Sequence, residues 1–271
     1  MVANLSPRMS VDNIQLNLKQ KMNIQGKCIT GCSLPPNGRM VLSCSSANIV
    51  SFINTEGVGL FQIGRDKTGF YPYDTVYIKE NNSVAVSSGG MRGNACITII
   101  DIVSQEVTTT ISMDTNIYGM AVRGRTIYYC AGNEGLKMLN LSDTYVSDII
   151  SSDMTNVYYV ATSGNKLYYT NYVIHTMTCC DLHGTTQWEF KDQSVLQGPL
   201  CISVDSDENV YVVGCLSNNV VIISPDGKRH RQLLSFKDGL RNPRVLDYDR
   251  STNRLLVVNN SSTAFLFDVT G

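Results

Sequence analysis

A pattern that recurs about every 43 residues most constrains the fold of this chain of 271 residues. Six short apolar runs each follow a polar turn, and their first residues are 44, 43, 40, 43 and 45 positions apart. The runs are Met40–Leu42, Val84–Val86, Ile127–Tyr129, Leu167–Tyr169, Val210–Val212 and Leu255–Val257. A polar turn directly before a short apolar run is typical of two antiparallel strands joined in a hairpin.

Two further marks accompany every apolar run. A tetrapeptide that begins with Asn, Asp or Ser follows each run, and such a residue favours a type I turn because its side chain bonds the backbone two residues on. These tetrapeptides are NTEG (54–57), DIVS (101–104), NLSD (140–143), DLHG (181–184), SPDG (224–227) and DVTG (268–271). A tripeptide precedes each run by 10 to 13 residues and opens another strand: KCI (27–29), PYD (72–74), IYG (117–119), VYY (157–159), PLC (199–201) and PRV (243–245).

Each repeat therefore contains four strands, here called A to D in chain order. Helical periodicity is almost absent, and β-branched and tyrosine side chains dominate the runs. Four-stranded units that repeat every 40–45 residues are typical of propeller blades packed around a central channel. We predict an all-β, six-bladed β-propeller over 13–271, with blades near 26–63, 70–111, 116–150, 155–191, 198–236 and 242–271.

The last repeat ends at Gly271, directly after its DVTG turn, and so has no strand D of its own. Upstream of the first blade, Ile14–Leu18 alternates apolar and polar side chains, which is the pattern of a strand with one buried face. We expect 13–19 to supply the missing strand and close the ring, with 1–12 left as the remnant of a linker.

The composition limits the cellular compartments and the binding partners that the chain is expected to have. Only 17% of the residues are charged, and 22 basic residues face 23 acidic ones, which argues against nucleic-acid binding through bulk charge. No run of 18 apolar residues suggests a membrane span, and the first residues lack the apolar core of a secretion signal. Nine cysteines without a regular framework fit free thiols. We therefore expect a cytoplasmic protein that does not enter a membrane.

The sequence offers little for catalysis or metal binding. The three histidines, His175, His183 and His230, match no metal-ligand spacing, and neither a CxxC nor a GxSxG motif is present. Of the aspartates, only Asp74 and Asp247 fall inside a predicted strand A, at repeat offsets that differ by two. We expect no catalytic residue, no metal and no cofactor, with a metal-dependent hydrolase or lactonase as a less favoured alternative.

The middle residue of each opening tripeptide should lie at one mouth of the channel, where the D–A and B–C connections meet. Three of the six are tyrosines and one is arginine, and both types are suited to recognition. The six residues are Cys28, Tyr73, Tyr118, Tyr158, Leu200 and Arg244. The same tyrosines could instead serve only to plug the channel. Around them, the D–A connections bring Lys27, Lys67, Tyr71 and Arg241, and the B–C connections bring Arg92 and Tyr172.

With these marks in place, the chain resembles the NHL-repeat propellers, in particular the C-terminal NHL domain of TRIM-NHL proteins. The stretches that carry the resemblance are NPRVLDYDRSTNRLLVVNNSSTAFLFDVTG (242–271) and GPLCISVDSDENVYVVGCLSNNVVIISPDG (198–227). The chain departs from the family pattern after strand B, where the usual Asp is replaced at or near Ser43, Ser87, Cys130, Thr170, Val213 and Val258. The Arg or His that often opens strand C in the family is also mostly missing.

The resemblance implies a recognition domain without catalytic activity of its own, which would recruit the protein substrate of a TRIM-like ubiquitin ligase. It also implies an alternative, the binding of single-stranded RNA on the face that carries Tyr73, Tyr118 and Arg244. RING, B-box and coiled-coil segments usually precede this domain in the family, and none is visible in this sequence. We expect a monomeric propeller with a protein as its partner.

Overall fold

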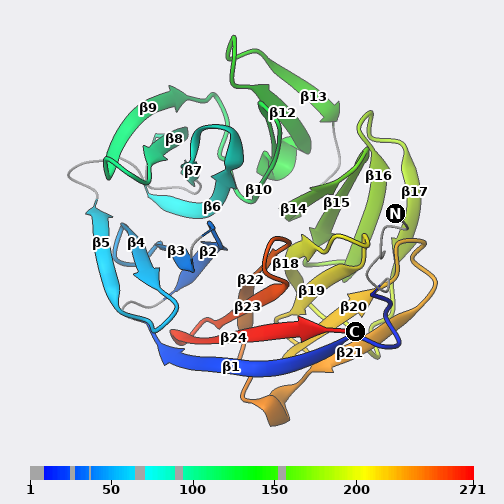
Figure 1. Ribbon diagram of the computed structural model, residues 1–271. Coiled ribbons are helices and arrows are strands. Elements are labelled where there is room, and N and C mark those ends of the chain that lie inside the picture. Colours follow the sequence, from blue (N-terminus) through cyan, green and yellow to red (C-terminus); the bar gives the residue numbers. More distant parts are fainter. Residues whose placement is uncertain (1–8, 25–27, 37, 65–70, 89–93, 152–156) are drawn as a thin grey trace, which may run out of the picture.

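Short amphipathic runs joined by polar turns build six four-stranded antiparallel sheets around one axis (Figure 1). The computed structural model describes residues 9–24, 28–36, 38–64, 71–88, 94–151 and 157–271. In each sheet strand A is innermost; in five of the six sheets strands B, C and D follow outward in chain order, and in the sixth the outermost strand is β1. The predicted fold class, an all-β propeller of six blades with four antiparallel strands each, is confirmed.

The strand bounds follow the repeat. Blade 1 contains β2 (Ile29–Ser33), β3 (Arg39–Cys44), β4 (Ile49–Asn54) and β5 (Gly59–Gly64). Blade 2 contains β6 (Pro72–Ile78), β7 (Ser83–Ser88), β8 (Cys96–Asp101) and β9 (Glu106–Ser112). Blade 3 contains β10 (Met120–Arg123), β11 (Thr126–Cys130), β12 (Leu136–Asn140) and β13 (Val146–Ile150).

The second half of the ring repeats the plan. Blade 4 contains β14 (Val157–Ser163), β15 (Lys166–Asn171), β16 (Thr176–Asp181) and β17 (Thr186–Phe190). Blade 5 contains β18 (Pro199–Val204), β19 (Val210–Gly214), β20 (Asn219–Ile223) and β21 (His230–Leu234). Blade 6 contains β22 (Pro243–Asp249), β23 (Arg254–Asn259), β24 (Thr263–Thr270) and, as strand D, β1 (Gln15–Asn23).

The ring closes through both ends of the chain, as the alternation in Ile14–Leu18 predicts. Strand β1 pairs antiparallel with β24 from Gln15 opposite Thr270 to Asn23 opposite Thr263, so it continues four residues past the predicted end at residue 19. Figure 1 shows β1 lying along the outside of β24.

The segment before β1 is part of the folded ring. Residues 9–12 were expected to belong to a linker, but Val11 is fully buried. The Met9 amide donates to Asp207 in the A–B turn of blade 5 at 2.8 Å. Because Val11 is buried and Met9 is bonded to blade 5, this segment packs against the ring instead of extending freely into solvent.

The middle strands explain the low charge fraction. Strands β7, β19 and β20 are buried along their whole length, whereas the outer strand β9 has only exposed and half-buried residues. Sheets covered on both faces by neighbouring blades need apolar side chains on both faces, so charged residues are left to outer strands and turns. No helix of the described residues has the length and apolar character that crossing a membrane requires.

Hydroxyl groups near the end of strand B join neighbouring blades. The Ser43 hydroxyl of blade 1 donates to the Tyr73 carbonyl of blade 2 at 2.6 Å, and Ser87 of blade 2 donates to the Tyr118 carbonyl of blade 3 at 2.7 Å. Thr170 of blade 4 contacts the Leu200 carbonyl of blade 5 in the same way at 2.7 Å. Each bond fixes the start of strand A in one blade to strand B of the blade before it.

Candidate functional site

The residues predicted at the channel mouth are positioned by irregularities in strand A. The pairing of strands A and B shifts register between Pro72 and Thr75, between Val157 and Tyr159, and between Pro243 and Val245. A bulge re-aims the side chain that it contains. Tyr73, Tyr158 and Arg244 lie inside these three bulges and at the end of the channel where the D–A and B–C connections meet, here called the D–A face.

The tyrosines of this mouth pack against one another from blade 2 to blade 4. The rings of Tyr73 and Tyr118 meet edge to face, with centroids 5.1 Å apart. Tyr118 and Tyr158 meet in the same way at 5.5 Å, and Tyr158 and Tyr172 at 6.5 Å. Edge-to-face pairs of aromatic rings are favourable beyond the area they bury. Four predicted site residues therefore form one continuous group of half-buried rings.

Arg244 belongs to the support of this group. Its guanidinium is half-buried and hydrogen bonds with the side chains of Tyr73 and Tyr159. Burial raises the pKa of Tyr73 to about 12, so its hydroxyl stays neutral. The Tyr159 hydroxyl donates to the Thr30 carbonyl of blade 1 at 2.6 Å. The N–H groups of Arg244 are directed at the tyrosine hydroxyls in the channel. Arg244 therefore orients the aromatic rings and does not present a forked donor to solvent.

The other predicted residues have different surroundings. Tyr71 is half-buried, and Arg241 is exposed with its guanidinium carbon 3.1 Å from the ring centre of Phe236. Arg241 also donates to the carbonyls of Phe236 and Leu240, both at 2.7 Å. Three further predicted residues, Lys27, Lys67 and Arg92, lie outside the described residues.

Exposed apolar side chains continue the aromatic group toward the rim, and sequence reasoning missed them. Val173, Ile174 and Leu216 are 55%, 49% and 48% exposed, and all three lie in B–C turns of blades 4 and 5. A Cβ added to Gly198 would lie within 3 Å of both Tyr172 and Leu216, so these side chains are neighbours. The sequence does carry a signal for them: apolar residues occupy B–C turns, where polar residues are usual. Together with Tyr118, Tyr158 and Tyr172, they are here called the apolar strip.

A small recess opens beside the first two rings of the strip. It has a volume of about 230 Å³ and is lined by Tyr118, Tyr158, Asn116, Asn133 and Glu134. Glu134 belongs to a short 3₁₀ turn in the B–C connection of blade 3 (Gly132–Glu134). Its carboxylate pairs with Lys137 at 2.9 Å.

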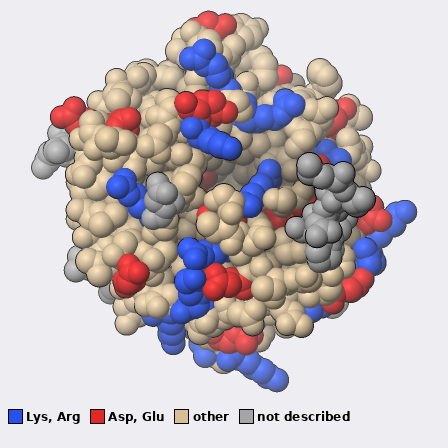
Figure 2. Space-filling model, in the orientation of Figure 1, with Lys and Arg blue, Asp and Glu red and all other residues tan. Residues whose placement is uncertain are grey.

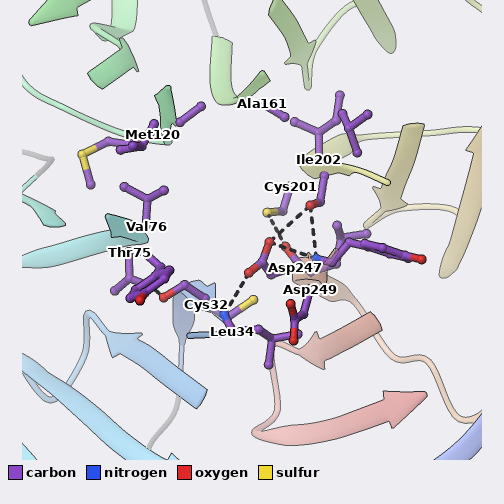
Figure 3. Close-up of a pocket in the computed structure, with 18 of the residues that line it drawn as sticks. Cys32, Leu34, Thr75, Val76, Met120, Ala161, Cys201, Ile202, Asp247 and Asp249 are labelled. Atoms are coloured by element: carbon purple, nitrogen blue, oxygen red, sulfur yellow. Dashed lines mark hydrogen bonds between the residues drawn. The ribbon is translucent and has the colours of Figure 1, made fainter. Parts of the chain in front are cut away.

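A larger cavity of about 600 Å³ occupies the channel below the tyrosines (Figure 3). Its walls are the second halves of the A strands, and its rim is formed by A–B turns, so it opens on the face opposite to the D–A face. Asp74 and Asp247 both line it. Their repeat offsets, which differ by two, predict different depths in the channel, and the charge of Asp247 adds to the rise in the pKa of Asp74.

These two carboxylates bind backbone of neighbouring blades. Asp74 accepts from the Met120 amide of blade 3 at 2.8 Å. Asp247 accepts from the Leu34 amide of blade 1 at 2.9 Å (Figure 3). Burial raises the pKa of Asp74 to about 8, and it raises the pKa of Asp247 as well. A carboxylic acid that remains protonated at neutral pH and accepts structural bonds is suited to joining blades.

Cysteines in the same cavity are not activated. Burial raises the pKa of the Cys32 and Cys201 thiols well above the usual range, so neither is a thiolate at neutral pH. Among the described residues, no three His, Cys, Asp or Glu side chains are grouped so that they could hold a metal ion. Figure 2 shows the face onto which this cavity opens, where basic and acidic side chains are interspersed around the centre.

Comparison with known proteins supports the fold and adds no family. No family model matches the chain, and no curated protein matches it. A solved structure of unknown function from Bacteroides thetaiotaomicron superposes with a TM-score of 0.76 at 12% identity, covering 94% of this chain and 73% of that one. Virginiamycin B lyase from Staphylococcus aureus gives a TM-score of 0.66 at 10% identity, covering 96% and 100% of the two chains. A streptogramin B lyase gives 0.65 at 14% identity, covering 97% and 90%. At such identities, the likeness shows the six-bladed architecture alone.

Proposed function

We propose that this propeller is a non-catalytic recognition module that binds a protein partner through the apolar strip on the D–A face. The observation that carries the proposal is the continuity between the packed tyrosines of the channel mouth and the exposed Val173, Ile174 and Leu216 at the rim. Contiguous exposed apolar surface marks protein interaction sites. Rigid aromatic side chains at its centre supply contact area at a low cost in conformational entropy.

Single-stranded RNA fits this face less well. Such binding requires stacking rings together with basic side chains that reach the phosphates. Two of the five basic residues predicted here, Arg241 and Arg244, are directed at carbonyl or hydroxyl groups of the protein itself. The apolar rim residues also give a phosphate backbone nothing to bind. RNA binding is therefore one outcome of the test below.

Lyase chemistry is also less favoured, although two of the similar folds belong to lyases. One reported structure is a virginiamycin B lyase inactivated by a histidine-to-alanine substitution. In this chain none of the three histidines lines the central cavity. His175 in a B–C turn accepts from the Gly198 amide, His183 follows Asp181 in a C–D turn, and His230 lies on the outer strand β21 against Phe190.

The cellular role follows from the resemblance to TRIM-NHL propellers, and we include it in the proposal. The module would recruit the protein substrate of a ubiquitin ligase and act in the cytoplasm. All nine cysteines are free thiols, which is compatible with a reducing compartment.

A peptide selection tests the proposal. A random 12-residue phage library is selected on the wild-type propeller, and enriched peptides are measured by fluorescence polarisation against wild type and a Val173→Asp/Leu216→Asp variant. The variant should lose at least tenfold in affinity, because two carboxylates enter the apolar strip. The matched control is Val103→Asp, a change in a C–D turn on the opposite face at a residue that is 75% exposed.

Three results would overturn the proposal. One is a selection that enriches no peptide. Another is a set of peptides whose affinity for the Val173→Asp/Leu216→Asp variant equals that for wild type. The last is a 15-residue oligouridylate that binds wild type but not the variant, which would assign the face to RNA. Thermal melts of both variants control for folding.

A further inference from the structure

The recess beside Tyr118 and Tyr158 has a composition that differs from the rest of the apolar strip. Its lining combines two aromatic rings with Glu134, Asn116 and Asn133, and it contains neither Lys nor Arg. An apolar side chain that covered the recess would supply no hydrogen-bond partner to the amide groups of Asn116 and Asn133. The chemistry of the recess therefore requires a ligand that carries donors.

The two rings that line the recess meet edge to face. Their planes meet at 82° with centroids 5.5 Å apart, so the edge of one ring touches the face of the other. Two planes in this arrangement form a corner bounded by ring faces on two sides. A cation within about 6 Å of a ring centre is attracted by the negative face of the ring, and more strongly where water is displaced.

The charges around the recess have the matching sign. Glu134 is exposed at its edge and pairs with Lys137, whose side chain is only 15% exposed. The same ammonium pairs with Asp148 at 3.2 Å. Two carboxylates around one ammonium leave a net charge of −1 beside the rings. This local field favours a cationic ligand over a neutral or anionic one.

The wall of the recess is shaped by a glycine. Gly132 has a φ of +62°, and a Cβ added there would lie 3.0 Å from Cε2 of Tyr118. A left-handed backbone that approaches an aromatic ring this closely favours glycine. The B–C turn of blade 3 therefore holds the Tyr118 ring at a fixed place beside the recess.

We propose that this recess binds a cationic side chain, lysine or arginine, of the protein partner. This inference rests on the proposed function for its biological ligand, since the partner segment would lay its apolar side chains on the strip and insert one basic side chain beside Glu134. The rings would provide two cation–π contacts, and Glu134 an ionic hydrogen bond.

The test uses a small probe, so that it does not depend on finding the partner. Butylguanidinium is titrated into the propeller at constant ionic strength, and the ring signals of Tyr118 and Tyr158 are followed by NMR. The neutral isostere butylurea is the matched ligand control. We expect saturable shifts with butylguanidinium, and at least fivefold weaker binding of butylurea.

Substitutions at Tyr118 show whether the probe binds to the face of the ring or to its hydroxyl group. Tyr118→Phe keeps the ring face and should bind the probe within twofold of wild type, whereas Tyr118→Leu should abolish saturation. Glu134→Gln should weaken the probe three- to tenfold, and Glu80→Gln, in the A–B connection of blade 2, should leave it unchanged. Equal binding of butylurea and butylguanidinium, or full binding by Tyr118→Leu in a folded protein, would refute the inference.

The two proposals fail in different ways. Saturable binding of butylguanidinium without any enriched peptide would refute protein recognition by the strip and support the cation site. Peptides that bind the strip through apolar residues alone, together with no saturable probe binding, would support the strip and refute the cation site.

Discussion

The buried carboxyl of Asp74 should make the propeller less stable as the pH rises through the neutral range. In the folded chain both carboxylate oxygens accept backbone amides, from Thr75 and from Met120, each at 2.8 Å. Burial nevertheless raises the pKa to about 8, from 3.8 in an exposed aspartate. Between these values the folded chain keeps a proton that the unfolded chain has lost. The free energy of unfolding therefore decreases as pH increases from about 4 to about 8.

The size of the change in unfolding free energy follows from the one proton by which the folded and unfolded chains differ. The step from pH 5 to pH 7, which lies inside this window, therefore lowers the free energy of unfolding by about 3 kcal/mol. Asp74→Asn cannot ionise and should lose this slope. Its amide group matches only one of the two backbone donors, which adds a loss of about 1–3 kcal/mol that does not depend on pH.

Urea unfolding at pH 5, 6 and 7 measures the effect. Trp188 is the only tryptophan and contacts blade 5 through a bond from its indole N–H to the Pro225 carbonyl, so its fluorescence reports on blade packing. The contribution of Asp205, whose pKa burial also raises, cancels in the difference between wild type and Asp74→Asn, whereas that of Asp247 cancels only in part because its charge interacts with Asp74. Identical pH slopes in the two proteins would refute the reasoning.

Two further substitutions test how the ring is closed and how its blades approach one another. Ile14→Ala should lower the free energy of unfolding by about 2–5 kcal/mol because Ile14 is fully buried beside blade 5. Leu18→Ala, at an exposed position of β1, should change the free energy of unfolding by less than about 1 kcal/mol. Equal effects of the two substitutions in urea titrations would contradict the closure. Gly119→Ala should reduce the melting temperature by several degrees, since its Cβ would lie 2.5 Å from the Tyr158 carbonyl oxygen. Gly59→Ala, with open space around the added Cβ, should leave the melting temperature unchanged. An unchanged melting temperature of Gly119→Ala would count against this close approach.

The architecture was predictable from the repeat because each recurring sequence feature, a turn or an apolar run, is required by the local structure at its own position. A turn requires a side chain or glycine at a fixed offset, and a buried strand requires apolar residues, so both appear in the sequence. The closing strand was predictable for the same reason: Ile14–Leu18 alternates, and DVTG leaves its blade one strand short. Its extension to Asn23 was missed because Lys19, Gln20 and Lys21 interrupt the alternation where β1 carries an irregularity after Leu18.

The candidate site was less predictable because it depends on contacts between blades. The repeat offset correctly brought Tyr73, Tyr118 and Tyr158 together, but it could not show that Arg244 is directed at tyrosine hydroxyls. That orientation follows from a bulge, which no local residue pattern announced. The packing of Tyr172 against Leu216 likewise joins turns of two blades that are 44 residues apart.

The composite sixth blade also determines how the ring responds to force. Gln15 and Thr270 are paired at the same end of the β1–β24 ladder, close to where Met9 and Gly271 meet. Tension applied to these two ends would load the first pair of residues alone and then each following pair in turn. The strands would peel apart one rung at a time, without the simultaneous rupture that pulling on opposite ends of a ladder requires. A ring closed by pairing between β1 and β24 would therefore open at low force when pulled from these two ends.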